Sequence, residues 1–266
     1  MHYTYRDIKQ AYKKVGVKKG RIILLKTDLS LLGKFEKVCK NEILKAHFNT
    51  LVNLIDLNQG TIVVSTSTSS LINTDKVFDP KNTPSESGIL TEYIREQKGA
   101  IRSFHPFTSY AAIGKRAKTI CEDVSRHAFG PETPEARMLE LDVLCVSIGM
   151  HPHLTCSTVH HLEMVMGVPY RYPKEYVHPV YRNGRIRKEC FYRYPWYRQC
   201  GIKKNRCAKI FERLYKEGLK IREAHLGRGR VFSYSLQDFY KKCLKIFKED
   251  MFVYLDEIPK IKPYRR

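Results

Sequence analysis

Short aliphatic runs alternate with segments of helical periodicity along most of the chain. The clearest run, Val-Leu-Cys-Val-Ser-Ile at residues 143–148, ends at Gly149, and a bounded apolar run of this length is typical of a buried strand. Apolar residues three and four positions apart predict helices over residues 42–57 and 236–249. Such an alternation predicts an α/β fold with a central mixed, largely parallel sheet flanked by helices.

The other elements follow from the same patterns and from turn chemistry. Asn183-Gly184 is the strongest short hairpin signal in the chain and predicts a hairpin over residues 177–189. This hairpin and the aromatic, basic segment after it form a predicted lid, residues 168–200, inserted in a single domain of residues 1–266. We also predict helices over residues 5–15, 88–97, 111–126 and 203–217, and strands over residues 22–25, 61–64, 227–231 and 251–255.

The chain is strongly basic, with 48 Lys and Arg residues against 27 Asp and Glu residues. A field of this sign attracts anions such as nucleotides and phosphorylated small molecules, although a basic surface can also serve solubility alone. The basic residues are dispersed rather than striped, and no nucleic-acid-binding module is recognisable, so we expect no nucleic-acid partner.

No apolar stretch approaches the roughly 20 residues that a membrane-spanning helix needs, and the first residues lack the apolar core of a signal peptide. We therefore expect a cytoplasmic protein without a membrane span. The eight cysteines include no Cys-x-x-Cys pair, which predicts free thiols and no metal site.

Two short segments concentrate the chemistry. Residues 102–114 read Arg-Ser-Phe-His-Pro-Phe-Thr-Ser-Tyr-Ala-Ala-Ile-Gly, and the proline disfavours a helix at that point. A loop with a cation, hydroxyls and backbone N–H groups suits a phosphate-bearing cofactor. In the second segment His160 and Glu163 are three positions apart, which places them on one face of a helix. A histidine buried for structural reasons is the alternative.

Several motifs follow one another in a fixed order, and together they span nearly the whole chain. They are Phe78-Asp79-Pro80, Thr83-Pro84-Ser85 with Gly88, Arg102-Ser103-x-His105-Pro106-x-x-Ser109, a strand closing on Ile148-Gly149, Thr158-Val159-His160-x-x-Glu163, and Val168-Pro169-Tyr170. This ordered set, far more specific than any single piece, resembles the aminoglycoside 3-N-acetyltransferase family, whose fold is distinct from the GNAT fold.

The resemblance implies an acyl-CoA-dependent N-acyltransferase with acetyl-CoA as co-substrate, in which a substrate amine attacks the thioester directly. His160 matches the family's general base. An imidazole that titrates near neutrality suits this role and typically contributes about 10²–10⁴-fold. His161 is the rival, but adjacent helical residues point about 100° apart, so both cannot face one cleft. Glu163 or Glu189 would orient the base.

The resemblance also implies the residues that bind CoA, although one stretch departs from the family. Relatives usually carry His-Ser-Ser after the first strand, where this chain has Lys26-Thr27-Asp28 followed by Leu29-Ser30. The predicted cofactor-binding residues are Lys26, Ser30, Arg102, Ser103, His105 and Ser109.

A second departure concerns the acceptor. Aminoglycoside-modifying members place acidic residues after the hairpin, and the matching positions here are Arg193 and Pro195. Because like charges cost affinity, we predict an anionic acceptor, an amino sugar linked to a nucleotide or phosphate in surface-polysaccharide biosynthesis. Arg193, Trp196 and Tyr170 are its predicted contacts.

Three alternatives stay open on the sequence alone. The acceptor could be an aminoglycoside antibiotic, as in the family's resistance enzymes. The chain could be a catalytically degenerate member that binds CoA as a regulatory protein, or its charge could serve nucleic acid. The oligomeric state, a homodimer included, is also open.

Overall fold

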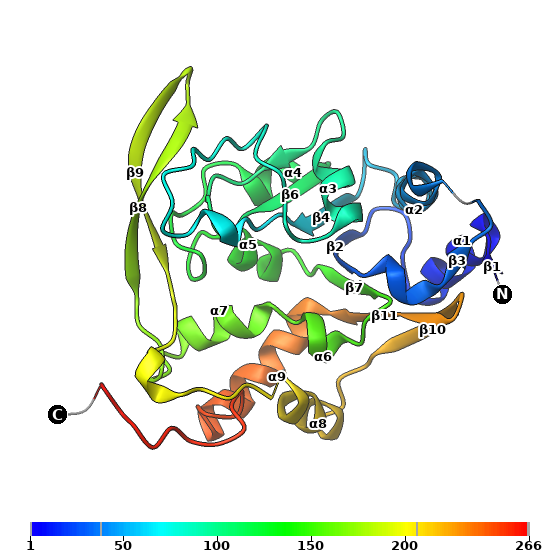
Figure 1. Cartoon of the computed structure of the whole chain (residues 1–266). Coiled ribbons are helices and arrows are strands. Elements are labelled where there is room, and N and C mark those ends of the chain that lie inside the picture. Colours follow the sequence, from blue (N-terminus) through cyan, green and yellow to red (C-terminus); the bar gives the residue numbers. More distant parts are fainter. Residues whose placement is uncertain (1, 38, 206, 265–266) are drawn as a thin grey trace.

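A seven-stranded sheet forms the centre of the fold (Figure 1). The computed structural model describes residues 2–37, 39–205 and 207–264, so the predicted domain of residues 1–266 and the helix predicted over 203–217 include positions outside the described residues. In spatial order the strands are β10 (Arg222–Leu226), β11 (Gly229–Ser235), β7 (Leu144–Ile148), β2 (Ile22–Thr27), β4 (Thr61–Ser65), β6 (Tyr110–Gly114) and β5 (Ile101–Arg102).

The mixed α/β sheet predicted from the sequence is confirmed. Only its centre is parallel: β2 pairs in parallel with β7 and with β4. The outer pairings are antiparallel, so the expectation of a largely parallel sheet holds for three strands only. The reason is the connections, because antiparallel neighbours can be joined by a short turn, as at Gly227 between β10 and β11.

Helices cover both faces of the sheet, as the apolar run of β2 predicts. Successive strand residues point to opposite faces: Ile23 and Leu25 belong to one apolar cluster, and Leu24 to the other. The first cluster is completed by α1 (Tyr5–Lys14), α2 (Lys40–Ile55) and α3 (Ile89–Arg95). The second contains residues of α4 (Ala117–Cys121), α5 (Pro134–Glu140), α7 (Thr158–Val165), α8 (Ala208–Lys216) and α9 (Leu236–Glu249).

Two predicted elements are wrong. Residues 111–126 were expected to form a helix, but their first part belongs to β6, where Ala111 and Ala112 pair with β4 and are fully buried. Helix propensity is a weak prior that such burial overrides. Residues 251–255 form turns rather than a strand, and within them Leu255 makes a single bridge to Lys204.

The predicted hairpin is confirmed and is longer than expected. Strands β8 (Lys174–Arg182) and β9 (Arg185–Arg193) form a separate ribbon whose tip extends past the main sheet (Figure 1). Asn183 and Gly184 at the turn both have positive φ, 51° and 76°, as a two-residue type I′ turn requires. A short parallel pair, β1 (His2–Tyr3) and β3 (Lys34–Phe35), lies apart from the sheet. No helix in the described ranges is long and apolar enough to cross a membrane.

Candidate active site

The side chains of His160 and Glu163 meet on α7, as their spacing predicts. The Nδ1 atom of His160 lies 2.6 Å from Oε2 of Glu163. Glu163 is fully buried, whereas 29% of the His160 side chain is exposed. A short helix, α6 (Pro152–Thr155), leads from the carboxyl end of β7 to α7, so the pair sits at the edge of the parallel strands, where open α/β sheets place their ligands.

Two further side chains hold Glu163. The hydroxyl of Tyr170 donates to Oε1 at 2.8 Å, and the guanidinium of Arg171 lies 2.8 Å from Oε2. Burial alone would raise the pKa of Glu163, but the hydrogen bond from His160 and the charge of Arg171 lower it below its ordinary value. Glu163 is therefore an anion with both oxygens occupied.

The hydrogen bond assigns the tautomer of His160. An ionised carboxylate only accepts, so Nδ1 carries the proton that it donates to Glu163. Arg171 also approaches Nδ1, at 3.1 Å, but both atoms are then donors, and we treat this as a close approach rather than a bond. Nε2 makes no hydrogen bond to any residue that the structure describes, so in an uncharged ring it can accept a proton, as a general base must.

His160 opens onto a cavity of about 480 Å³. The Nζ atom of Lys26 donates to Oγ of Ser157 at 2.9 Å, which places the predicted cofactor residue Lys26 directly behind the cavity wall. We call this space the His160 cavity. Its lining residues are Met150, His153, Leu154, Thr155, Cys156, Ser157, His160, Lys204, Cys207 and Tyr254.

Arg102, predicted to bind phosphate, instead joins neighbouring loops through hydrogen bonds. Its guanidinium donates to Oγ of Ser109 at 3.0 Å and to Oγ1 of Thr68 at 2.8 Å. It also donates to the carbonyl oxygens of Thr66 at 2.6 Å and Thr83 at 2.5 Å. Four of its five N–H groups are thus used within the protein, and burial lowers its pKa to about 10.

The other polar residues of this loop form hydrogen bonds within the protein. Oγ of Ser103 accepts from the backbone N–H of Tyr110 at 2.9 Å. Nδ1 of His105 accepts from two backbone N–H groups, at 3.0 and 3.2 Å, and burial lowers its pKa to about 3. Ser109 is fully buried against Thr66. The predicted contacts of these residues with CoA therefore rest on the resemblance alone.

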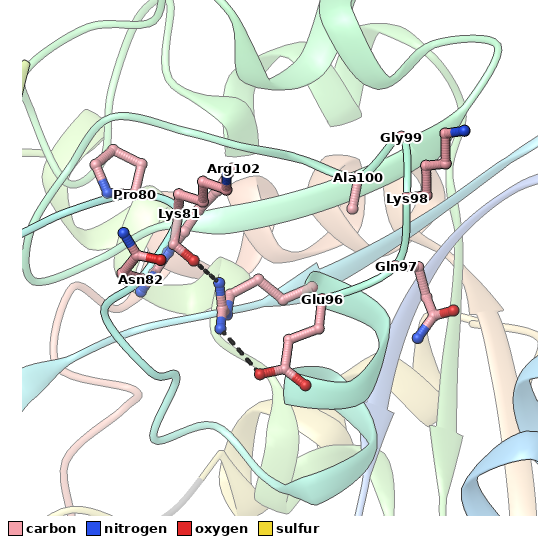
Figure 2. A pocket seen from close by; sticks show the side chains of 10 residues that line it. Pro80, Lys81, Asn82, Glu96, Gln97, Lys98, Gly99, Ala100 and Arg102 are labelled. Carbon is pink, nitrogen blue, oxygen red and sulfur yellow. Dashed lines mark hydrogen bonds and ion pairs between the residues drawn. The ribbon is translucent and has the colours of Figure 1, made fainter. Parts of the chain in front are cut away.

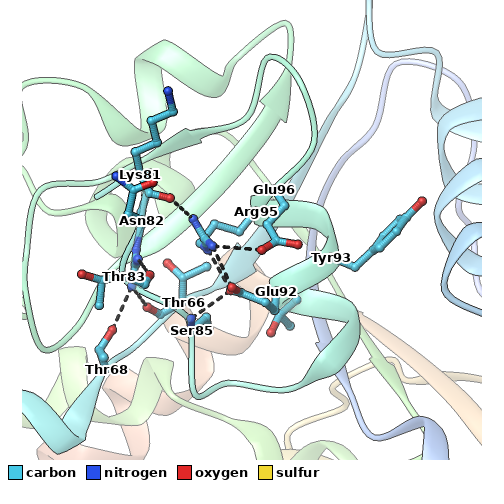
Figure 3. A network of polar contacts seen from close by, with 12 residues as sticks. Thr66, Thr68, Lys81, Asn82, Thr83, Ser85, Glu92, Tyr93, Arg95 and Glu96 are labelled. Carbon is cyan, nitrogen blue, oxygen red and sulfur yellow. Dashed lines mark hydrogen bonds and ion pairs between the residues drawn. The ribbon is translucent and has the colours of Figure 1, made fainter. Parts of the chain in front are cut away.

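A second cavity, of about 680 Å³, lies beside Arg102 (Figure 2). Among the residues that the structure describes, it shares none with the lining of the His160 cavity, so the predicted anion loop and the predicted base open onto separate spaces. Arg95 borders it, and Figure 3 shows this guanidinium bound to Glu92, with nitrogen–oxygen distances of 2.7 Å. Lys81 and Lys98 are its exposed cations.

The remaining predicted residues are dispersed. Ser30 is exposed and donates to Asp28 at 2.6 Å, forming a local turn. Glu189 pairs with Arg126 at 2.5 Å and with Arg182 at 3.6 Å. Glu163 rather than Glu189 is therefore the carboxylate that contacts His160.

The three residues predicted to contact the acceptor lie in different surroundings. Tyr170 is 1% exposed and supports Glu163 from behind, instead of lining the cavity as predicted. The guanidinium of Arg193 lies 5.9 Å from the centre of the Phe107 ring. Trp196 is near the cavity, because Lys204, which lines it, has its ammonium 4.5 Å from the indole centre.

Three residues of the site were not predicted from the sequence. Lys204 and Tyr254 come from segments without a motif, and their place at the cavity follows only from the packing of the carboxyl-terminal region. Arg171 follows the Val168-Pro169-Tyr170 motif directly, so that motif marked its neighbourhood.

The mixed sheet and the carboxylate-oriented imidazole facing a cavity define an α/β enzyme suited to general-base catalysis. Comparison with known proteins supplies the family. The model of the aminoglycoside 3-N-acetyltransferase family matches residues 24–248, and the chain belongs to this family of acyl-CoA-dependent N-acyltransferases, for which acetyl-CoA is the co-substrate.

Individual relatives are distant. Aminoglycoside N(3)-acetyltransferase III of Salmonella sp is 25% identical over 199 residues, covering 69% of this chain and 68% of that protein. Aminoglycoside N(3)-acetyltransferase IX of Micromonospora chalcea is 32% identical over 111 residues, and the match spans only 41% of this chain and 39% of that protein.

Solved structures share the fold along most of the chain. The aminoglycoside acetyltransferase AAC(3)-IIb has a TM-score of 0.79 at 19% identity, covering 94% of this chain and 98% of that one. AAC-IIIb, solved with CoASH, has a TM-score of 0.79 at 16% identity and covers 94% and 97%. YokD from Bacillus subtilis has a TM-score of 0.77 at 18% identity, with 94% and 95% covered.

Proposed function

We propose that this chain is an acetyl-CoA-dependent N-acetyltransferase that acylates an amine of an amino sugar, with His160 as general base. One observation carries the proposal: Nδ1 of His160 is fixed 2.6 Å from the buried Glu163 while the same ring lines a cavity of about 480 Å³. Family membership supplies the reaction class, and the geometry supplies the base.

Nε2 of His160 removes one proton from the neutral amine as the nitrogen attacks. The amine nitrogen bonds to the thioester carbonyl carbon, and the carbon–sulfur bond then breaks to release CoA. The proton held by His160 passes to the departing thiolate, so the products are the N-acetyl amide and CoA. Glu163 stabilises the transient imidazolium, and Tyr170 and Arg171 fix Glu163 in place.

The relatives favour an aminoglycoside as acceptor over the nucleotide-linked amino sugar that we predicted from the sequence. Those matched here are themselves named aminoglycoside acetyltransferases, and nothing in the comparisons points to polysaccharide biosynthesis. We therefore take an amine of an aminoglycoside-type amino sugar as the primary candidate.

One observation favours a second candidate, an acceptor with an anionic group. The described residues that line the His160 cavity include Lys204 and His153 but no Asp or Glu. A polycationic drug gains from carboxylates, and a cation at the cavity wall opposes its binding. An amino sugar carrying a phosphate would gain from the same lysine.

Both candidates are tested in one assay. The purified protein is incubated with acetyl-CoA and a kanamycin-type drug, glucosamine, or a phosphorylated or nucleotide-linked amino sugar. N-acetylated product is measured by mass spectrometry and CoA by thiol release. We expect transfer to at least one acceptor and its loss in His160→Ala. CoA binding without transfer to any amine would instead support the regulatory alternative.

A further inference from the structure

A largely buried tyrosine packs against His160 at the wall of the cavity. Tyr254 lines the His160 cavity, and its ring lies 5.5 Å from the His160 ring, centre to centre, at an interplanar angle of 89°. Only 6% of Tyr254 is exposed. Within the described residues its hydroxyl makes no hydrogen bond, and it is not among the fully buried unpaired atoms, so it stays accessible from the cavity. A hydroxyl that lines a cavity without a protein partner can donate to a bound ligand.

The backbone around Tyr254 is held on both sides. Nδ2 of Asn205 donates to the carbonyl oxygens of Val253 and Leu255, at 2.8 and 3.1 Å. Nζ of Lys209 donates to the Leu255 carbonyl at 3.0 Å, and the N–H of Asn205 donates to that of Tyr254 at 3.3 Å. These contacts fix a segment that has no regular secondary structure, so the position of the hydroxyl is set in advance, as a catalytic donor requires.

The other hydroxyls of the cavity are already in use. Oγ of Ser157 accepts from Lys26 at 2.9 Å, and Oγ1 of Thr155 lies 3.3 Å from Oγ of Ser147 and 3.3 Å from the carbonyl oxygen of Pro152. Burial raises the pKa of Tyr254, so its hydroxyl keeps its proton and can donate.

We propose that Tyr254 is a further catalytic residue, whose hydroxyl donates a hydrogen bond to the acyl oxygen of acetyl-CoA during transfer. This inference rests on the proposed function. As the amine nitrogen bonds to the carbonyl carbon, the electron pair of the C=O double bond moves to oxygen. The resulting oxyanion is where a positioned donor acts most strongly. When the double bond re-forms, the carbon–sulfur bond breaks and the hydroxyl retains its proton.

The test compares Tyr254→Phe with wild-type protein and with Tyr240→Phe. Tyr240 is a matched control, because its ring is partly buried and contacts His161, at 5.9 Å between ring centres, instead of His160. We expect kcat of Tyr254→Phe to fall about 10²-fold, with the KM for acetyl-CoA and the midpoint of thermal unfolding unchanged. Tyr240→Phe should match wild type in all three quantities.

Each other outcome counts against the inference. A Tyr254→Phe protein with wild-type kcat, or with a change confined to KM, would overturn it. A loss of folded structure would do so as well, because a hydroxyl without a protein partner should not hold the fold. If wild-type protein transfers acetyl groups and His160→Ala does not, the proposed function stands whatever Tyr254→Phe does. If wild-type protein transfers to no amine, both fall.

Discussion

The ammonium of Lys204 lies 4.5 Å from the centre of the Trp196 ring. The guanidinium of Arg171 lies 5.2 Å from the same centre. Two cations therefore lie against the indole at the border of the His160 cavity. A cation over an aromatic face is attracted to it, which holds Lys204 at the cavity even though the residue itself is exposed. The charge of this border should therefore bear on which amines enter.

Reversing the charge of Lys204 tests that effect. We expect Lys204→Glu to raise kcat/KM for a polycationic aminoglycoside and to lower it for a phosphorylated amino sugar, each by about tenfold, the equivalent of 1.4 kcal/mol. Lys203→Glu is the matched control, because Lys203 is exposed, pairs with Glu257 and does not line the cavity. Equal shifts in both variants would show that only the overall charge matters.

Replacing Glu163 by Gln tests the orientation of the base. The amide can donate to Nδ1 and favour the wrong tautomer, so kcat should fall about 10²-fold or more. Arg171 would lose its charge partner in a buried place, which we expect to reduce the free energy of unfolding by about 3 kcal/mol. Steady-state kinetics and urea unfolding measure the two effects.

Glu189→Gln serves as the comparison, because Glu189 pairs with Arg126 and Arg182. Its kcat should stay at the wild-type value. A larger loss of kcat in Glu189→Gln than in Glu163→Gln would show that the wrong carboxylate has been assigned to the base.

Stability should fall in mild acid because several histidines are buried, and burial lowers the pKa of each. Burial lowers the pKa of His47 and of His105 to about 3, whereas the unfolded value is about 6.5. Between these values the unfolded chain binds protons that the folded chain does not, so the free energy of unfolding decreases as pH falls from about 6.5 toward 3. The lowered pKa of Glu163 adds to this loss at the acid end.

Urea unfolding at a series of pH values between 7.5 and 4 measures this dependence. His47→Gln should flatten the curve in part, since one of the buried rings with a strongly lowered pKa is then absent. A free energy of unfolding that stays constant from pH 7 to pH 5 in the wild-type protein would contradict the assignment.

Replacing Arg102 should lower the free energy of unfolding more than it weakens the binding of acetyl-CoA. In Arg102→Met the carbonyl oxygen of Thr83 loses its donor, whereas that of Thr66 still accepts from Oγ of Ser109. The guanidinium's hydrogen bonds to Thr68 and Ser109 are lost as well, and we expect the free energy of unfolding to drop by about 1–3 kcal/mol, with a smaller change in Arg185→Met at the exposed hairpin tip. A stable Arg102→Met protein with a raised KM for acetyl-CoA would restore the phosphate-binding role predicted from the sequence.

The sequence predicted the centre of the fold better than its edges. The apolar run at β2 is buried on both faces, and α9 spans the predicted residues, because both patterns depend on burial alone. Ala111 and Ala112 are ambiguous by composition, and only their pairing with β4 makes them a strand.

At the site, the pairing of His160 with Glu163 was predictable because it is local to one helix. The fate of Arg102 was not, since its partners Thr66 and Thr83 lie in other loops. A loop whose arginine is hydrogen-bonded within the protein has the same sequence pattern as a loop whose arginine binds a phosphate. Tyr254 was missed for a related reason, because tertiary packing alone brings it to His160.

The anchoring of residues 253–255 onto Asn205 and Lys209 also has a consequence in time. The imidazole and its carboxylate both come from α7, but the cavity wall at Tyr254 belongs to a much later part of the chain. A chain emerging from the ribosome therefore contains both residues of the pair well before it contains the segment that completes this wall. Activity should emerge after helical structure when the unfolded protein is returned to native conditions.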